Sequence, residues 1–156
     1  MEPRIVEKDA FLLMGVLTIG SPDKLDYADI WENKYMPFDA RIKPHSMDGA
    51  YYGAWIGDEG GGLPGYLAGM AVDPLAAAPE GCVLHPVPAA KYAVFDCSIK
   101  NIGSTYQFVW QEWMPASSYV YDAGKSDFEY YPAAEEGQEM VVSIWIPVKQ
   151  KEAVAS

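Results

Sequence analysis

A carboxylate set among aromatic side chains marks residues 126–132 (Ser-Asp-Phe-Glu-Tyr-Tyr-Pro) as the stretch best suited to chemistry. If this stretch is a strand, Asp127, Glu129 and Tyr131 share one face, because strand side chains alternate. A Glu buried there without a partner would be costly, so a cation or hydrogen-bond donors should meet it. Glu129 is therefore the central candidate for a ligand-binding residue. The alternative is an exposed Glu paired with a lysine, which is the usual environment of a glutamate.

The aromatic residues form a second candidate set, because 13% of the chain is aromatic, mostly Tyr and Trp. Most of these rings are expected in the core. A subset that faces a cleft could hold a flat or cationic ligand, since a desolvated cation over an aromatic face gains about 2 kcal/mol. The rings in question are Tyr51, Tyr52, Trp55, Tyr66, Trp110, Trp113, Tyr131 and Trp145.

The charge of the chain narrows the function classes. The 156 residues include 11 Lys and Arg against 22 Asp and Glu, which gives a formal net charge of −11. This sign disfavours direct binding of nucleic acid and mildly favours cationic ligands, although a need for solubility explains the larger share of the acidity. Neither a basic patch nor a helix-turn-helix pattern is evident, so DNA reading is not expected.

The sequence indicates no metal site and no cofactor. His45 and His85 are isolated, and Cys82 and Cys97 lack the CxxC spacing, so reduced structural thiols are expected. Residues 11–17 are apolar, but they are too few to span a bilayer and show no signal-peptide cleavage site. We therefore expect a cytoplasmic protein that does not bind membranes.

The first half of the chain is predicted to form a strand, a helix and two strands. Residues 4–20 indicate a strand buried on both faces and bent at Gly15. Ser21 is expected to cap the helix that follows, and Pro37 to end or kink it. Residues 50–56 and 65–72 indicate a hairpin with a long acidic tip. The helix would present an aromatic stripe on one side, at Tyr27, Trp31, Tyr35 and Phe38.

The second half repeats this plan. Residues 83–99 are expected to form a strand, Ser104 to cap a helix, and residues 128–131 and 140–148 to form the last two strands. In both helices a Tyr precedes a Trp by four positions, at Tyr27 and Trp31 and again at Tyr106 and Trp110.

The repeated pattern predicts two modules, residues 1–74 and 82–149, within a single domain of residues 1–149. The expected fold is α+β, a pseudo-twofold pair of β-α-β-β modules around a central ligand cleft. Residues 150–156 are expected to be a flexible tail.

Five motifs in order along the chain resemble the GyrI-like small-molecule-binding domain, the effector-binding module of AraC-type and MerR-type transcription regulators. Each motif is weak alone, but together they cover nearly the whole chain. They are Tyr51-Tyr52-Gly53-Ala54-Trp55, Pro88-Ala89-Ala90-Lys91-Tyr92-Ala93-Val94-Phe95, Trp110 with Trp113-Met114-Pro115, Asp127-Phe128-Glu129-Tyr130-Tyr131, and Ile144-Trp145-Ile146-Pro147.

The resemblance implies binding of lipophilic, often cationic aromatic compounds such as drugs, with a Glu on the cleft floor. That Glu matches Glu129, and the aromatic residues of the cleft match Tyr51, Trp55, Tyr66, Trp110 and Tyr131. The chain is expected to be a free-standing form without a DNA-binding domain, so sequestration or a partner regulator protein would have to replace a regulator's output. A homodimer is a further alternative for its assembly.

Two alternative functions follow from the same resemblance. Some free-standing members are hydrolases that open cyclopropanes in DNA-alkylating compounds, and in that reaction Glu129 would be the general base, with a tyrosine hydroxyl such as that of Tyr131 positioning water. A protein-interaction role of the gyrase-inhibitor type is the third possibility. Simple ligand binding is preferred, because it requires only aromatic rings and a charge.

Overall fold

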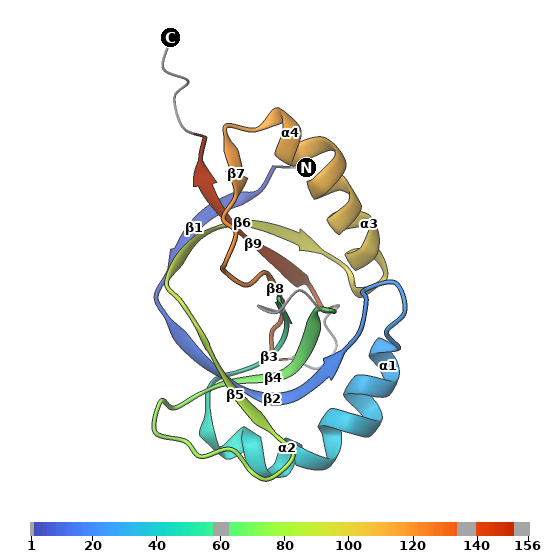
Figure 1. Cartoon of the computed structure of the whole chain (residues 1–156), viewed down its shortest axis with the longest axis vertical. Helices are drawn as coiled ribbons and strands as arrows, with labels where there is room; N and C mark the ends of the chain where they lie inside the picture. Colours follow the sequence, from blue (N-terminus) through green and yellow to red (C-terminus); the bar gives the residue numbers. More distant parts are fainter. Residues whose placement is uncertain (1, 58–62, 134–139, 152–156) are drawn as a thin grey trace.

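The computed structural model describes residues 2–57, 63–133 and 140–151, and within them the chain forms one antiparallel sheet covered by helical segments. Figure 1 shows the strongly curved sheet, with the α1–α2 helical segment against one half and the α3–α4 segment against the other. This arrangement confirms the α+β class. The strands are β1 (Arg4–Lys8), β2 (Phe11–Ile19), β3 (Ser46–Ile56), β4 (Gly65–Val72), β5 (Val83–Val87), β6 (Ala90–Cys97), β7 (Tyr119–Tyr121), β8 (Phe128–Tyr131) and β9 (Val142–Gln150).

The strand order is β1-β6-β9-β8-β3-β4-β2-β5, with β7 paired to the far end of β9. Read outward from the central β8–β3 pair, each half places its last strand, β9 or β4, next to its first main strand, β6 or β2. The outermost strands are exchanged: β1 pairs with β6 of the second half, and β5 pairs with β2 of the first half. This order is what two repeated modules would give, and the twofold relation itself stays a prediction.

Two predicted strands are each divided in the structure. The stretch 4–20 forms β1 and β2, and the stretch 83–99 forms β5 and β6, separated at Pro88. The prediction of single strands was wrong, because each break lets the first piece pair with the opposite half of the sheet. Burial of β2 on both faces holds only in its middle, since Leu17 and Ile19 are 36% and 60% exposed.

The remaining strands lie close to their predicted positions. The predicted hairpin is the β3–β4 pair, although β3 begins earlier, at Ser46, and its predicted tip at 58–62 lies outside the described residues. The acidic loop at 134–139 and the last residues of the predicted tail, 152–156, also lie outside them. Gln150, assigned to that tail, is the last residue of β9 and pairs with Tyr119.

The first helical segment begins later than predicted. It consists of α1 (Tyr27–Asp29), the π-helical η1 (Ile30–Tyr35), α2 (Met36–Ile42) and the 3-10 turn η2 (Lys43–His45). Asp26 is its N-cap and accepts a hydrogen bond from the backbone N–H of Asp29 at 3.1 Å, so the assignment of Ser21 as the cap was wrong. Ser21 instead begins a turn, in which its carbonyl accepts from the N–H of Lys24 at 2.9 Å.

Pro37 does not end this helix, which continues to Ile42. A proline inside an α-helix removes one hydrogen bond and clashes with the carbonyl four residues earlier. Here the wider π-helical turn directly precedes the proline, and its i to i+5 pattern relieves that conflict. The same combination recurs in the second segment, where π-helical η4 (Val109–Trp113) precedes Pro115.

The second helical segment consists of η3 (Ile99–Asn101), α3 (Ile102–Phe108), η4 and α4 (Met114–Ala116). Ser104 is not its cap: the segment starts at Ile99, and the Ser104 hydroxyl donates to the carbonyl of Asn101 at 3.1 Å from inside the helix. The capping prediction failed because a 3-10 turn precedes the α-helix and moves its start upstream.

The two faces of the sheet carry different cores. On the helix-bearing face, the first segment packs on β2 and β4 around Tyr35 and Met70, and the second packs on β6 and β9 around Phe95 and Val109. The opposite face joins both halves in one cluster, which includes Phe128. Each helical segment therefore covers the outer strands of its own half, and the central strands β3 and β8 lie between them.

Candidate ligand-binding site

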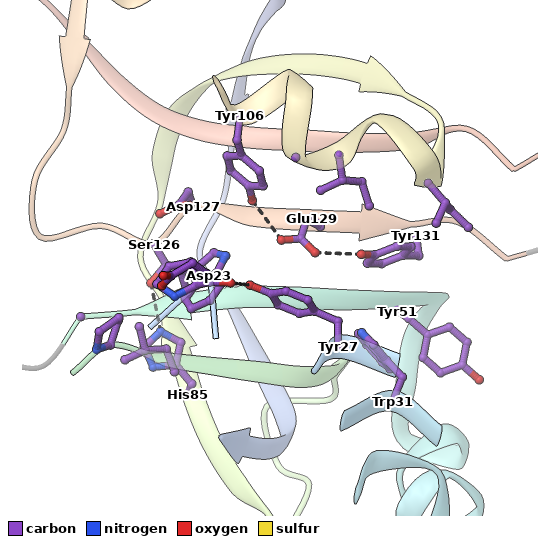
Figure 2. A pocket seen from close by; sticks show the side chains of 18 of the residues that line it. Asp23, Tyr27, Trp31, Tyr51, His85, Tyr106, Ser126, Asp127, Glu129 and Tyr131 are labelled. Atoms are coloured by element: carbon purple, nitrogen blue, oxygen red, sulfur yellow. Dashed lines mark hydrogen bonds between the residues drawn. The ribbon is translucent and has the colours of Figure 1, made fainter. Parts of the chain in front are cut away.

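A cleft of about 1510 Å³ opens on the helix-bearing face, with residues of β3 and β8 in its lining. This volume exceeds the roughly 300–1,000 Å³ typical of drug-sized pockets. The first helical segment contributes Tyr27 and Trp31, and the second contributes Tyr106 and Trp110, so the repeated Tyr and Trp pairs face the same space. Figure 2 shows this cleft with β8 crossing it.

The two tryptophans of these pairs occupy equivalent local structures. Trp31 lies in η1 and Trp110 in η4, the two π-helical turns. A π-turn inserts one extra residue into a helix and rotates the side chains that follow it, and such turns are often found at functional sites. Both tryptophans therefore reach the cleft from π-helical turns.

Glu129 lies in the wall of the cleft near its centre and is only 4% exposed. Its neighbours Phe128 and Tyr130 point to the opposite face of the sheet, as the predicted alternation requires. Three tyrosine hydroxyls donate to its carboxylate: Tyr131 at 2.8 Å and Tyr66 at 3.1 Å to Oε1, and Tyr106 at 3.0 Å to Oε2. Figure 2 shows the bonds from Tyr131 and Tyr106. The hydrogen-bond donors expected for a buried Glu are therefore phenols from three different elements.

Burial raises the pKa of the Glu129 carboxyl above its ordinary value, and the hydrogen bonds from Tyr131, Tyr106 and Tyr66 lower it in part. The negative charge of Asp127 adds to the rise. Conversely, burial and the nearby Glu129 raise the pKa of all three tyrosines, so they remain neutral donors. Within the described residues, no Lys, Arg or His forms a salt bridge with Glu129.

The position of Tyr66 depends on a glycine. In the sheet, Gly53 of β3 pairs with Glu129 of β8 and with Ala68 of β4. A Cβ at Gly53 would overlap the Tyr66 ring and hydroxyl, so only glycine leaves the space through which Tyr66 reaches Glu129. The indole N–H of Trp31 also donates to the Tyr66 hydroxyl at 3.2 Å, which fixes the Tyr66 hydroxyl from the helix side.

Most of the predicted site residues meet at this cleft. Tyr51, Trp55, Trp110 and Tyr131 line it together with Glu129. Tyr66 is fully buried and lies behind Glu129, so it reaches the cleft only through its hydrogen bond to the carboxylate. The prediction of Tyr66 as a cleft-lining ring therefore needs this correction, because the strand alternation that brings it to the right face also places it beneath the first helical segment.

Tyr27, Trp31 and Tyr106 line the cleft but were not predicted as site residues. The shared spacing of the Tyr and Trp pairs was interpreted only as evidence for a repeat. In a cleft formed between two repeated modules, equivalent positions of both modules face the same space, so the spacing itself was the signal that could have identified them.

One end of the cleft has a separate polar group. Asp127, which lies on the same face of the chain as Glu129, accepts a hydrogen bond from the Tyr121 hydroxyl at 3.3 Å, and burial raises its pKa to about 6. Nearby, a ring nitrogen of His85 and the Ser126 hydroxyl lie 3.2 Å apart. No group of three or more potential metal ligands was found in the part of the chain that the structure describes.

These features define an effector-binding domain, and comparisons with known proteins identify its family. Residues 4–148 match the family described as Cass2, integron-associated effector binding protein. The chain therefore belongs to this family, which has the GyrI-like effector-binding fold, and the resemblance inferred from the sequence is confirmed.

Related proteins share this fold. The transcriptional regulator BrlR of Pseudomonas aeruginosa is 30% identical over 153 residues, which is 95% of this chain but only 56% of BrlR. The structure of SAV2435 bound to tetraphenylphosphonium matches with a TM-score of 0.78 at 18% identity, over 96% of this chain and 94% of that one. The integron cassette protein VCH_CASS2 of Vibrio cholerae matches with a TM-score of 0.63 at 21% identity, over 95% of this chain and 96% of that one.

No helix among the described residues is long and apolar enough to cross a membrane.

Proposed function

We propose that this protein binds lipophilic aromatic cations in the cleft, with Glu129 as the counter-charge. The observation that carries the proposal is a buried carboxylate that has three phenol donors but no cationic partner in the described residues. A charge in this environment is incompletely compensated, and a ligand cation is the group that would compensate it.

The walls of the cleft suit the rest of such a ligand. Tyr27, Trp31, Tyr51 and Trp55 line the cleft together with Glu129, and Trp110, also in the lining, is 41% exposed. Aromatic faces attract cations and also bury apolar surface, so they favour compounds that combine both properties. The wide, open shape favours many ligands over one closely fitted substrate.

One structural relative supports this class of ligand, and a second relative agrees with a regulatory role. SAV2435, with the same fold, was solved with tetraphenylphosphonium, a lipophilic aromatic cation. BrlR is a transcriptional regulator, and this chain spans 56% of its length, which agrees with an effector-binding module that reports on small molecules. The proposal extends these properties to this chain on the strength of its own Glu129 and aromatic walls.

Binding is favoured over hydrolysis by the occupancy of the carboxylate. A carboxylate has about four acceptor positions, and the hydroxyls of Tyr66, Tyr106 and Tyr131 occupy three of them. A general base would have to use the one remaining position, on Oε2, and that position would have to face water and substrate. Charge compensation has no such need, because a cation interacts with the carboxylate as a whole.

Calorimetric titration with tetraphenylphosphonium, the anion tetraphenylborate and the neutral triphenylphosphine oxide tests the proposal. The cation is expected to bind. Tetraphenylborate, an anion of nearly equal shape, is not expected to bind. Glu129→Gln should weaken cation binding by about tenfold or more, corresponding to ~1.4 kcal/mol, while changing binding of the neutral compound little.

Glu112→Gln is the matched control, since Glu112 is exposed on η4 outside the cleft and its loss changes net charge equally. If Glu129→Gln weakened the neutral compound as much as the cation, the role of charge pairing would be refuted. Binding of tetraphenylborate as tightly as the cation would refute the ligand class.

A further inference from the structure

A second carboxylate lies beside Glu129 in the same cleft. Asp127 precedes it by two residues, and both side chains are in the cleft lining. Two residues of extended chain span about 6.6 Å, which gives the approximate spacing of the two Cα atoms. Figure 2 shows Asp127 on the Ser126 side of Glu129 and Tyr131 on its other side, so the two carboxylates follow the direction of β8, which begins directly after Asp127.

Asp127 is less well compensated than Glu129. It accepts one long hydrogen bond, 3.3 Å from the Tyr121 hydroxyl, and no other side chain of the described residues donates to it. This bond and one from its own backbone N–H offset the cost of burying the Asp127 charge only in part, because its pKa stays raised.

The cationic groups at this end of the cleft do not neutralise Asp127. Lys125 lines the cleft, but its ammonium is paired with Asp122 at 2.9 Å. His85 faces Ser126, and burial lowers its pKa, which favours the uncharged ring near neutral pH. Within the described residues, the two neighbouring carboxylates therefore have no salt bridge to a protein cation.

Aromatic rings line the cleft from one carboxylate to the other. Tyr106 donates to Glu129, and both Glu129 and Asp127 raise the pKa of its hydroxyl, which places it within range of both. Trp110 packs edge-on against Tyr121, with ring centroids 5.2 Å apart, and is exposed beside the Asp127 end. A flat ligand that reaches from one carboxylate to the other would contact aromatic surface along its length.

From this arrangement we infer that the cleft selects rigid aromatic dications, with one cationic centre at Glu129 and the second at Asp127. The inference rests on the proposed function, because it assigns a second charge-recognition position within the same site. It predicts that a ligand with two separated positive centres binds more tightly than the same scaffold with one.

A matched series of biaryl compounds tests the inference: 1,1′-dimethyl-4,4′-bipyridinium with two charges, 1-methyl-4-phenylpyridinium with one, and neutral 4-methylbiphenyl. Affinities of the whole chain are measured by calorimetry at neutral pH. The dication is expected to bind about tenfold more tightly than the monocation. Asp127→Asn should remove most of that tenfold preference and change the affinity for the monocation by less than about threefold. Glu129→Gln should weaken the binding of both cations.

Glu112→Gln controls for net charge, because it removes one negative charge outside the cleft. Equal affinities of the wild type for monocation and dication would overturn the inference, and so would a dication preference that Asp127→Asn leaves intact. In either case the proposed function survives if Glu129→Gln still weakens the monocation. If neither cation binds more tightly than 4-methylbiphenyl, both the inference and the proposed function fail.

Discussion

The tyrosine shell of Glu129 should control the pH at which the cleft binds cations. Tyr106→Phe removes the hydroxyl that donates to Oε2 at 3.0 Å and keeps the ring. Because this hydrogen bond lowers the pKa of Glu129, its loss should raise that pKa further. The protonated Glu129 cannot compensate a cation, so the pH above which cations bind tightly should move upward.

The size of this shift follows from the strength of the lost contact. A hydrogen bond to a charged group contributes about 1.5–3 kcal/mol, and 1.36 kcal/mol corresponds to about one pKa unit. Tyr66 and Tyr131 still donate to Glu129 in this variant, and water from the open cleft can take the vacated position. The lower end of this energy range therefore applies. We expect the midpoint for cation binding to rise by about one pH unit.

The assay is the affinity for 1-methyl-4-phenylpyridinium from about pH 5 to about pH 8. Other titratable groups near Glu129 are Tyr66, Tyr131, Cys97 and Asp127. The two tyrosines and Cys97 have raised pKa values and stay neutral over this range. Asp127, with its pKa at about 6, does titrate within it, so the comparison is repeated in an Asp127→Asn background.

Tyr27→Phe is the matched control for the midpoint. Tyr27 lines the same cleft, but its hydroxyl donates to the carbonyl of Pro22 at 2.7 Å and not to Glu129. Its loss should leave the midpoint where it is in the wild type. An unchanged or lowered midpoint in Tyr106→Phe, or an equal rise in Tyr27→Phe, would refute the reasoning that the phenol shell holds Glu129 ionised.

Two further predictions concern stability. Gly53→Ala places a methyl group against the ring of Tyr66 and should reduce the free energy of unfolding in urea by about 1–3 kcal/mol, whereas Gly57→Ala, with open space around it, should change it by less than about 0.5 kcal/mol. The pKa values of Asp127 and Glu129 are raised in the native state. At pH values between their unfolded-state and native-state pKa values, the native state therefore binds more protons than the unfolded state. The contribution of Asp127 to the free energy of unfolding should therefore decline as pH rises from about 4 to about 6. Urea titrations of Asp127→Asn should show a shallower decline of that free energy with pH. An unchanged slope against pH would contradict the buried, ionisable state of Asp127.

The sequence was sufficient to predict the face on which Glu129 lies, but it left open whether Glu129 is buried. Strand alternation places Phe128 and Tyr130 on one side and Glu129 on the other in any regular strand, and the structure has this arrangement. The β3–β4 hairpin could also be predicted, because two apolar runs are separated by a glycine-rich stretch.

Helix starts and strand breaks could not be predicted equally well, because several residues have similar local preferences. Ser21 and Asp26 are both good N-cap residues, and the choice of Asp26 depends on where Tyr27 and Ile30 pack on the sheet. The division between β5 and β6 at Pro88 depends on which half of the sheet each piece joins. Such choices are decided by tertiary packing, which the local sequence pattern does not reveal.

The predicted aromatic stripe is present, because Tyr35 belongs to one core cluster on the helix-bearing face and Tyr27, Trp31 and Phe38 pack against it. Spacing alone could not predict how the stripe is divided between core and cleft. In the structure Tyr35 is fully buried in the core, while Tyr27 and Trp31 line the cleft. Trp31 and Tyr35 both lie in the π-helical turn, which the local sequence pattern did not indicate.

The charge selectivity proposed for this cleft follows from the state of the empty protein. Three phenols reduce the cost of burying Glu129 but leave its pKa raised, so the ionised empty cleft is higher in free energy than a fully compensated one. A ligand cation lowers that free energy wherever it sits close to the carboxylate, and the rest of the ligand needs only apolar surface. A wide cleft can therefore be selective for charge without being selective for shape, and a second uncompensated carboxylate at Asp127 would extend that selectivity from one charge to two.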